Sequence, residues 1–163
     1  MAPSRESLSP AAGAVALPPL IDPMRYHAWM TSPAIEPPSI FELIGGAEPL
    51  RTLVDRFYDL MELEPEFAGL RALHPSELDG SRDKLYWFLS GWSGGPNLYM
   101  ERFGHPRLRA RHLPYPISTS ERDQWLRCMA YAMQDTGLDE ALQLRLMQSF
   151  HETADWMRNR PDQ

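Results

Sequence analysis

The sequence has almost no cysteine and no long apolar run, and both absences exclude whole classes of protein. Cys128 is the single cysteine among 163 residues, so no intrachain disulfide can form and the chain is compatible with a reducing cytosol. No apolar run approaches the roughly 18–20 residues of a membrane span. The N-terminus lacks a basic region followed by an apolar block, so no secretory signal is expected. We therefore expect a cytoplasmic protein without a membrane partner.

Familiar catalytic and metal-binding motifs are absent as well. The sequence contains no glycine-rich phosphate loop, no HExxH motif and no cysteine-based zinc pattern. Its formal net charge is −6, and an acidic chain is a poor general binder of nucleic-acid phosphate. The acidic pairs Glu64/Glu66 and Asp79/Asp83 are typical of solvated helix faces. We expect no nucleic-acid partner and assign no catalytic residue.

Proline is unevenly distributed along the chain. Half of the 16 prolines fall within residues 1–38. Each proline removes a backbone donor and restricts its predecessor, so this stretch cannot form long helices. We predict a Pro-rich extension over residues 1–38, flexible at its start, and one domain over residues 39–163. The aromatic segment MRYHAWM, residues 24–30, could dock on the body of the protein.

From Ser39 onward the apolar residues follow helical periodicity. Ser39 can cap a short helix that ends at Gly45, and Ser118 begins a capping box with Glu121. Apolar residues recur at three- and four-residue spacing. This spacing predicts four substantial helices, over residues 47–63, 76–92, 118–136 and 138–157. Because no alternating strand pattern accompanies them, the predicted fold class is all-α.

Histidine, tyrosine and tryptophan are the remaining candidates for chemistry. A lone histidine in a helical protein is most often a hydrogen-bonded polar residue, and buried tyrosine and tryptophan usually belong to the core. Four facing helices can, however, enclose a large flat apolar cofactor, and one axial histidine is enough to hold haem iron. The residues alone leave two hypotheses open, a haem pocket and a haem-free helical interaction module.

Residues 104–117, GHPRLRARHLPYPI, combine two histidines with three arginines. On an acidic chain these arginines are a local feature and not part of a basic surface. Spacing alone does not decide whether His105 or His112 would be a ligand. His105 precedes Pro106, which biases it away from helical geometry, but this is only a weak argument for His112.

Four segments, in this order, resemble the group II truncated haemoglobins, which are compact two-over-two helical globins. They are FELIGGAEPLRTLVDRFY, GWSGGPNLY, GHPRLRARHLPYPI and ERDQWLRCM. The run GGPxxYxxxxGHPRLRxRHxP followed by WLRCM is long and specific. The resemblance extends from about Ile40 to Arg158 and leaves the Pro-rich extension outside. It implies a two-over-two helical sandwich that encloses haem b, iron protoporphyrin IX.

The resemblance also implies roles around the iron. His112 corresponds to the proximal ligand, and its other ring N–H is expected to donate to a backbone carbonyl. His105 corresponds to a residue that does not bind iron. Trp125 corresponds to the tryptophan that reaches over the bound ligand in groups II and III, and Tyr58 to the distal tyrosine. His74 stands where many members carry tyrosine or phenylalanine, and histidine there marks one subset.

Further residues are implied at the haem. Ser81 falls at a distal position where many group II members have a small residue. Arg111 and Tyr99 are candidates for binding the propionates, whereas Arg107 and Arg109 could be either haem contacts or solvated. The complete set implied to contact the cofactor is Phe57, Leu85, Phe88, Tyr99, Arg111, Tyr115 and Met129.

These assignments predict a five-coordinate iron with a polar distal pocket. Tyr58, Trp125 and His74 can each offer a hydrogen-bond donor to bound dioxygen, and such donors act more strongly in a dry pocket. Slow ligand release argues against bulk oxygen transport and favours redox chemistry with peroxide, nitric oxide or sulfide, with peroxidase-like or nitric-oxide-detoxifying activity left open. Expected partners are dioxygen and other small haem ligands, with a reductase and a homodimer as further candidates. The alternative is a ligand sensor or electron-relay protein that uses the N-terminal extension for partner binding.

Overall fold

Helices account for all the regular secondary structure in residues 35–162, the part of the chain that this computed structural model describes. The aromatic segment 24–30, and with it the docking hypothesis, lies outside the described residues. The all-α prediction is confirmed. The elements are α2 (Ile40–Ile44), α3 (Ala47–Leu63), η1 (Pro65–Phe67), α4 (Ala68–Arg71), α5 (Asp79–Trp92), α6 (Leu98–Phe103), α7 (Leu108–His112), α8 (Thr119–Asp135) and α9 (Glu140–Trp156).

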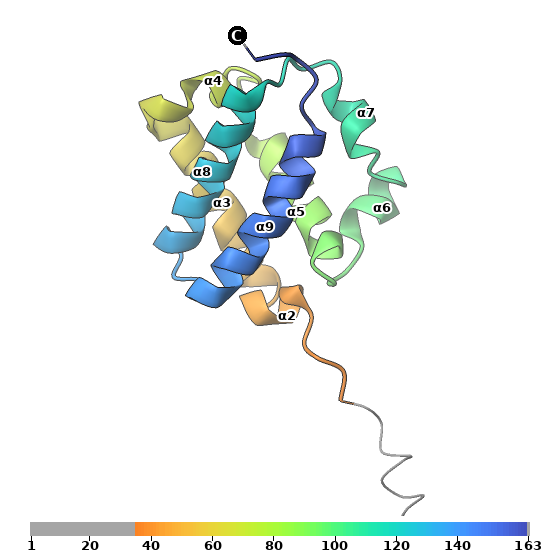
Figure 1. Cartoon of the computed structure of the whole chain (residues 1–163). Helices are drawn as coiled ribbons and strands as arrows, with labels where there is room; N and C mark the ends of the chain where they lie inside the picture. The colour runs from red at the N-terminus through yellow and green to blue at the C-terminus, as the bar shows by residue number, and fades with distance from the viewer. Residues whose placement is uncertain (1–34, 163) are drawn as a thin grey trace, which may run out of the picture. The chain divides into compact units, whose positions relative to one another are not determined.

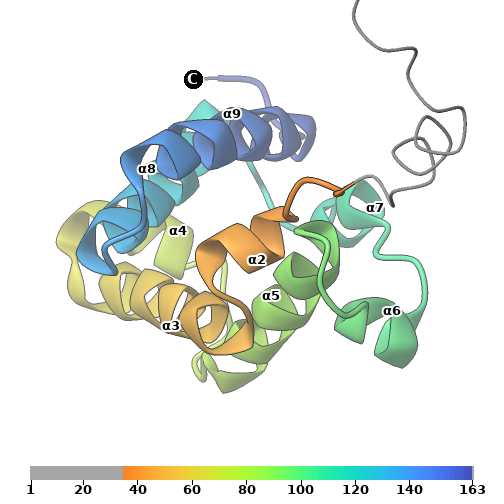
Figure 2. The ribbon, with the colours of Figure 1, turned by 90° about the horizontal axis from the view of Figure 1, so that it is seen from below.

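The four long helices form two layers. Helix α3 packs against α5, α8 packs against α9, and the two pairs meet mainly where α3 crosses α8. Figure 2 shows the α8–α9 pair lying over the α3–α5 pair. The short helices α6 and α7 lie to one side of this sandwich, next to α5 (Figure 1). This arrangement confirms the predicted two-over-two helical sandwich. Among the described residues, none of the helices combines the length and apolar character needed to cross a lipid bilayer.

The core fills the space between the two layers. It is built mainly from one face of α3 and one face of α8, which bury Leu50, Leu53, Val54, Phe57, Met61, Cys128, Met129, Ala132 and Met133 almost completely. The Cys128 thiol donates to the Phe57 carbonyl oxygen at 3.2 Å. Burial raises the pKa of Cys128 to about 12, so the thiol stays protonated and behaves as a small core residue.

Ion pairs connect α3 and α5, the two helices of one layer. The Arg82 guanidinium donates to Asp59 Oδ1 at 2.7 Å and to the Asp55 carbonyl oxygen at 2.9 Å. Its side chain is only 16% exposed. Arg51 adds a second link to Asp83 at 2.8 Å. Charge-assisted bonds to a largely buried guanidinium fix position better than surface pairs do, so they hold α5 in register against α3.

The segment before α5 differs from the prediction. Residues 65–75, between two of the predicted helices, contain η1 and α4, and the predicted start of the next helix at Ser76 is wrong because α5 begins at Asp79. Arg71 explains the difference, since its guanidinium donates to the carbonyl oxygens of Pro75 and Ser76 at 2.8 and 2.9 Å. These two carbonyl oxygens therefore accept hydrogen bonds from a side chain and not from the backbone N–H groups of a helix.

Both predicted helix caps are confirmed. Ser39 Oγ accepts from the Glu42 N–H at 3.2 Å, and Gly45 ends α2 in the left-handed region at φ 110°. At the start of α8, Ser118 Oγ accepts from the Ser120 N–H at 3.3 Å, while Glu121 Oε2 accepts from the Ser118 N–H at 2.9 Å. This reciprocal pair is a capping box.

The capping box predicts the effect of Ser118→Ala. Losing the cap leaves helix N–H groups without a partner, so the free energy of unfolding should fall by about 1 kcal/mol. Urea unfolding followed by circular dichroism measures this loss. Ser76→Ala is the control, because Ser76 is exposed and its hydroxyl makes no hydrogen bond among residues 35–162. An equal loss in both variants would contradict the capping role.

Candidate functional site

An apolar wall with accessible surface lies on the inner faces of α5, α8 and α9. Its side chains pack on the core yet remain only partly buried: Leu85, Phe88, Trp92, Trp125, Met147 and Ala154. The rings of Trp92 and Phe150 stack at 5.0 Å, and the Trp125 ring meets Phe150 edge-on at 5.4 Å. A partly open aromatic wall of this kind suits a flat apolar ligand.

His112, the last residue of α7, is half-buried and has a defined tautomer. Its Nδ1 lies 2.6 Å from the Leu108 carbonyl oxygen, one turn earlier. A carbonyl only accepts hydrogen bonds, so Nδ1 carries the proton and donates, as expected from the sequence. In the neutral ring this leaves Nε2 with a free lone pair, which is the form that binds a metal.

Polar bonds from the end of the chain hold α7 in place. Asn159 Nδ2 donates to the carbonyl oxygens of His112 and Tyr115 at 3.1 and 2.9 Å. Arg109 donates to the Trp156 carbonyl oxygen and stacks on the Trp156 ring at 4.9 Å. Arg109 therefore anchors α7 to the end of α9 and is not merely solvated. Sequence reasoning missed Asn159, because nothing in a single asparagine after a helix indicates its partners.

His105 differs from His112 in its local structure. It is exposed, and its Nδ1 accepts from the Arg107 N–H at 3.1 Å. Arg107 itself adopts the left-handed region at φ 45° and precedes the first residue of α7. His105 thus takes part in the turn that starts α7, which supports a structural role for it.

Three of the four predicted distal residues, Tyr58, His74 and Trp125, come from separate elements and are linked by ring contacts. The rings of Phe57 and Tyr58 lie 5.0 Å apart, and those of Phe57 and Trp125 lie 5.2 Å apart. The His74 ring meets the Tyr58 ring edge-on at 5.8 Å. Helix α3, the loop before α5 and helix α8 therefore place the three predicted distal side chains in one cluster.

Two donors of this cluster have no protein partner. Within residues 35–162, neither the Tyr58 hydroxyl nor the Trp125 indole N–H is hydrogen-bonded, and no fully buried side-chain nitrogen or oxygen lacks a partner. Both groups therefore border accessible space. Burial raises the pKa of Tyr58, with the nearby Arg82 opposing the shift, so the phenol keeps its proton and can donate it.

His74 already makes one hydrogen bond within the chain. Its Nδ1 lies 2.9 Å from the Leu70 carbonyl oxygen, so the proton of the neutral ring is already used there. Burial lowers the pKa of His74; the bond to Leu70 opposes this shift, and positive charge on Arg71 or His112 adds to it. The neutral ring thus presents Nε2 as an acceptor.

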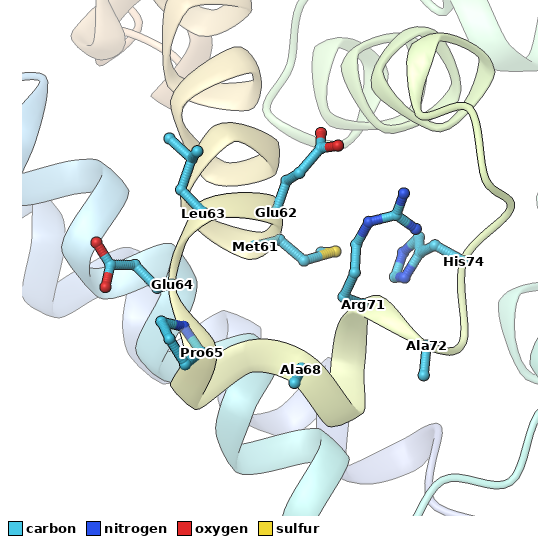
Figure 3. A pocket seen from close by; sticks show the side chains of 9 residues that line it. All are labelled: Met61, Glu62, Leu63, Glu64, Pro65, Ala68, Arg71, Ala72 and His74. Carbon is cyan, nitrogen blue, oxygen red and sulfur yellow. The ribbon is translucent and has the colours of Figure 1, made fainter.

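A surface cavity of about 410 Å³ lies beside His74 (Figure 3). It is lined by Met61, Glu62, Leu63, Glu64, Pro65, Ala68, Arg71, Ala72 and His74. Several of these residues are exposed, and Figure 3 shows the Arg71 guanidinium next to the His74 ring. His74 therefore borders both the distal cluster and a hollow on the protein surface, an arrangement that the sequence did not indicate.

The remaining predicted contacts divide into two groups. Ser81 and Leu85 are half-buried on one face of α5 together with Phe88, as their spacing requires. Phe57 and Met129 are instead completely buried. Their direct contact with the cofactor stays a prediction from the resemblance.

Three predicted residues lie near α6 and α7. The Arg111 guanidinium lies over the Tyr99 ring at 5.6 Å, and Tyr99 is 9% exposed. Tyr115 is 45% exposed. An arginine beside a tyrosine hydroxyl is a suitable pair for a carboxylate.

Comparison with known proteins identifies the family of this chain. The sequence model of the bacterial-like globin family matches residues 39–159. The chain belongs to this family. It is 41% identical over 117 residues to group 2 truncated hemoglobin YjbI of Bacillus subtilis, an alignment covering 72% of the chain and 86% of that protein. The predicted resemblance to group II truncated haemoglobins is confirmed.

Solved structures agree with the sequence comparison. The group II 2-on-2 hemoglobin of Agrobacterium tumefaciens superposes with a TM-score of 0.75 at 41% identity, covering 80% of this chain and all of that one. The truncated oxygen-avid haemoglobin of Bacillus subtilis superposes with a TM-score of 0.69 at 40% identity, covering 75% and 100%. Membership of this globin family implies a haem cofactor that binds small ligands such as oxygen. The free Nε2 of His112 and the half-buried aromatic wall fit such a group.

The geometry predicts opposite effects of two histidine substitutions. His112→Ala should remove axial histidine ligation, because no other residue of α7 offers a ring nitrogen, and the ferrous resonance Raman band of the iron–histidine stretch should disappear. His105→Ala is the matched control and should keep that band. Added imidazole should restore it in His112→Ala. Retention of the band in His112→Ala without imidazole would rule out His112 as the ligand.

The lowered pKa of His74 predicts a pH effect on stability. Below about pH 6.5 the unfolded chain binds a proton at His74 more readily than the folded chain does. Acidification should therefore destabilise the fold. His74→Phe should lose less stability than the wild type between pH 7.5 and 5.5, measured by urea unfolding. His151→Gln, at an exposed position on α9, is the control. An unchanged pH dependence in His74→Phe would contradict the assignment.

Proposed function

We propose that this globin binds dioxygen and other small ligands tightly at haem b and supports redox chemistry with peroxide, nitric oxide or sulfide, in preference to bulk oxygen transport. Haem b, when bound, supplies the iron at which these ligands are held. The observation that carries the proposal is the pair of donors, Tyr58 O–H and Trp125 N–H, that border accessible space without a partner among residues 35–162.

The two donors set the expected strength of ligand binding. A hydrogen bond stabilises partial negative charge on a diatomic ligand, and it does so more strongly where water is excluded. One such bond contributes about 0.5–1.5 kcal/mol, and about 1.4 kcal/mol corresponds to a tenfold change in an equilibrium constant. Two donors would slow ligand release by up to about a hundredfold, which is unsuitable for a carrier that must unload. The oxygen-avid relative from Bacillus subtilis supports this expectation.

The proximal side supports globin-like ligand binding. His112 donates to a neutral carbonyl, that of Leu108, at 2.6 Å and not to a carboxylate. A carboxylate partner would give the imidazole anionic character, which favours peroxidase chemistry, whereas a carbonyl leaves it neutral. We therefore propose ligand binding as the primary property, with redox reactions following from it.

His74 adds pH dependence to this proposal. While its ring is neutral, Nε2 accepts hydrogen bonds and can hold a water molecule or the Tyr58 hydroxyl. In acid the protonated ring would gain a second N–H beside the distal cluster, so His74 would then act as a donor. Ser81 offers a further hydroxyl from α5 or leaves room for ligand entry.

Redox chemistry that leaves the iron ferric requires an electron donor, so a reductase partner belongs to the proposal. A homodimer and a cytoplasmic location remain predictions from the sequence. The domain division also remains a proposal, with the extension over residues 1–38 outside the globin domain over residues 39–163.

The donor hypothesis is tested by oxygen dissociation rates measured in a stopped-flow instrument. Tyr58→Phe and Trp125→Phe should each release oxygen about tenfold faster, since each loses one donor without losing the ring. Tyr131→Phe is the matched control, because it also removes one hydroxyl, and Tyr131 is 37% exposed on α8 with its ring against Phe67. If Trp125→Phe releases oxygen as slowly as the wild type, Trp125 does not hold the ligand.

The reaction class is tested by absorption spectra. The ferric and ferrous protein is mixed in turn with hydrogen peroxide, nitric oxide and sulfide, and at least one reagent should react within seconds. Slow reaction with all three, combined with fast oxygen release, would instead favour transport. Absence of a Soret band after haem supplementation would leave only the haem-free helical interaction module.

A further inference from the structure

A group of arginines on α6 and α7 stands out from the rest of the molecule. Arg102, Arg107, Arg109 and Arg111 lie within ten consecutive positions, and all four are exposed. We call them the arginine face. Residues 98–117 contain only one acidic residue, Glu101, although the whole chain carries a formal net charge of −6. Positive charge is therefore concentrated at this place.

The arginine face is a cluster of arginines without ion pairs. Ion pairs between residues 35 and 162 engage Arg51, Arg56, Arg82, Arg122, Arg127 and Arg158. No arginine of the face has a carboxylate partner within this part of the chain. Arg71, Arg145 and Arg160 also lack an ion pair within residues 35–162, but they lie far apart in the sequence, whereas the four arginines of the face lie within ten positions.

Aromatic rings hold three of these guanidinium groups in place. Arg102 lies over the Trp87 ring at 4.3 Å and also donates to the Leu98 carbonyl oxygen at 3.1 Å. Arg109 and Arg111 lie over the rings of Trp156 and Tyr99. Stacking on aromatic faces fixes the guanidinium planes while their outer N–H groups stay free to donate. These side chains therefore lose less conformational entropy when a partner binds.

The haem propionates cannot compensate the whole arginine face. Two propionates carry two negative charges, so they neutralise at most two of the four arginines. Arg111, stacked on Tyr99, is the candidate for this role. At least two positive charges, including those of Arg102 and Arg107, remain for a partner outside the chain.

We propose that the arginine face docks an acidic electron-donor protein of the flavodoxin class, which reduces the ferric protein. This inference rests on the proposed function, because only a redox cycle needs such a donor. The face borders the segment that ends in His112, so a protein docked there would bring its flavin close to the haem pocket. Electron transfer falls steeply with distance, which makes this location favourable.

Charge distribution favours a small acidic protein over nucleic acid or an anionic membrane. At physiological ionic strength charges are screened beyond about 8 Å, so a compact partner meets mainly the arginine face. An extended polyanion would also meet the acidic remainder of the molecule. Electron-transfer complexes bury little surface and depend on complementary charge for fast encounter, which suits a patch of four residues.

The proposed reaction is a single electron transfer. One electron leaves the anionic, fully reduced flavin of the donor, which keeps its N5 proton and becomes a neutral radical. Haem, when bound by this chain, would supply a ferric iron as the acceptor of that electron. No bond forms or breaks and no proton moves between the proteins.

The test uses the full-length, haem-loaded ferric protein and a purified acidic flavodoxin as the probe. Binding is followed by fluorescence anisotropy of labelled oxidised flavodoxin at low ionic strength, and electron transfer by stopped-flow mixing with fully reduced flavodoxin. Arg102→Glu/Arg107→Glu should weaken binding and slow the second-order reduction by at least about tenfold. The difference should shrink as salt is added, because screening removes the attraction.

Arg145→Glu is the matched control. Arg145 is an exposed arginine on α9 and lies about 16 Å along that helix from Trp156, which contacts the face. This variant makes the same change from a positive to a negative side chain. Its dissociation constant for flavodoxin should stay within about twofold of the wild-type value. The neutral variant Arg102→Gln/Arg107→Asn should show a smaller loss in the same direction, and asparagine tolerates the left-handed backbone at position 107.

The outcomes separate this proposal from the proposed function. A wild-type protein without a Soret band would overturn the proposed function. A haem-loaded double variant with an unchanged Soret band and unchanged flavodoxin binding would overturn the docking surface alone. A third outcome is that the wild type binds phosphatidylglycerol vesicles but not flavodoxin, and that the double variant loses the vesicle binding. This outcome would assign the arginine face to an anionic membrane.

Discussion

The hydrogen bond from His112 Nδ1 to the Leu108 carbonyl is the interaction on which the candidate site depends. It fixes both the tautomer and the orientation of the ring, and without it Nε2 would not be held ready as a ligand. Helix α7 is only five residues long and buries none of them, so packing cannot hold it. Asn159 and Arg109 hold it from the C-terminal side. The proximal side therefore depends on polar bonds to a segment 47 residues further along the chain.

The distal side is held in a different way. Phe57 is fully buried between Tyr58 and Trp125, so tight core packing sets the positions of both donors. Arg82 then fixes α5 against α3 through Asp55 and Asp59. A change in the core would move Tyr58 and Trp125, whereas a change at the C-terminus would move His112. The two sides of the site can therefore be perturbed separately.

Much of the fold could be predicted from the sequence, because it depends on local patterns. Helical periodicity and the caps at Ser39 and Ser118 need only neighbouring residues. Details of the site depend on contacts between distant residues, and these were less predictable. Periodicity shows that Met129 faces inward, but not that it is completely buried. The use of the His74 proton by the Leu70 carbonyl likewise follows from a backbone bend that no motif encodes.

The stretch 104–117 combines two functions that a short segment can carry together. Its half-buried side presents His112 toward the pocket, and its exposed side presents arginines that no carboxylate of the described chain neutralises. An acidic chain that concentrates its uncompensated positive charge beside the ligand histidine attracts anionic groups to that place. Because the same five-residue helix carries His112, Arg109 and Arg111, a bound partner would press on the element that positions the iron ligand. Partner docking and proximal geometry are thereby coupled through one short helix.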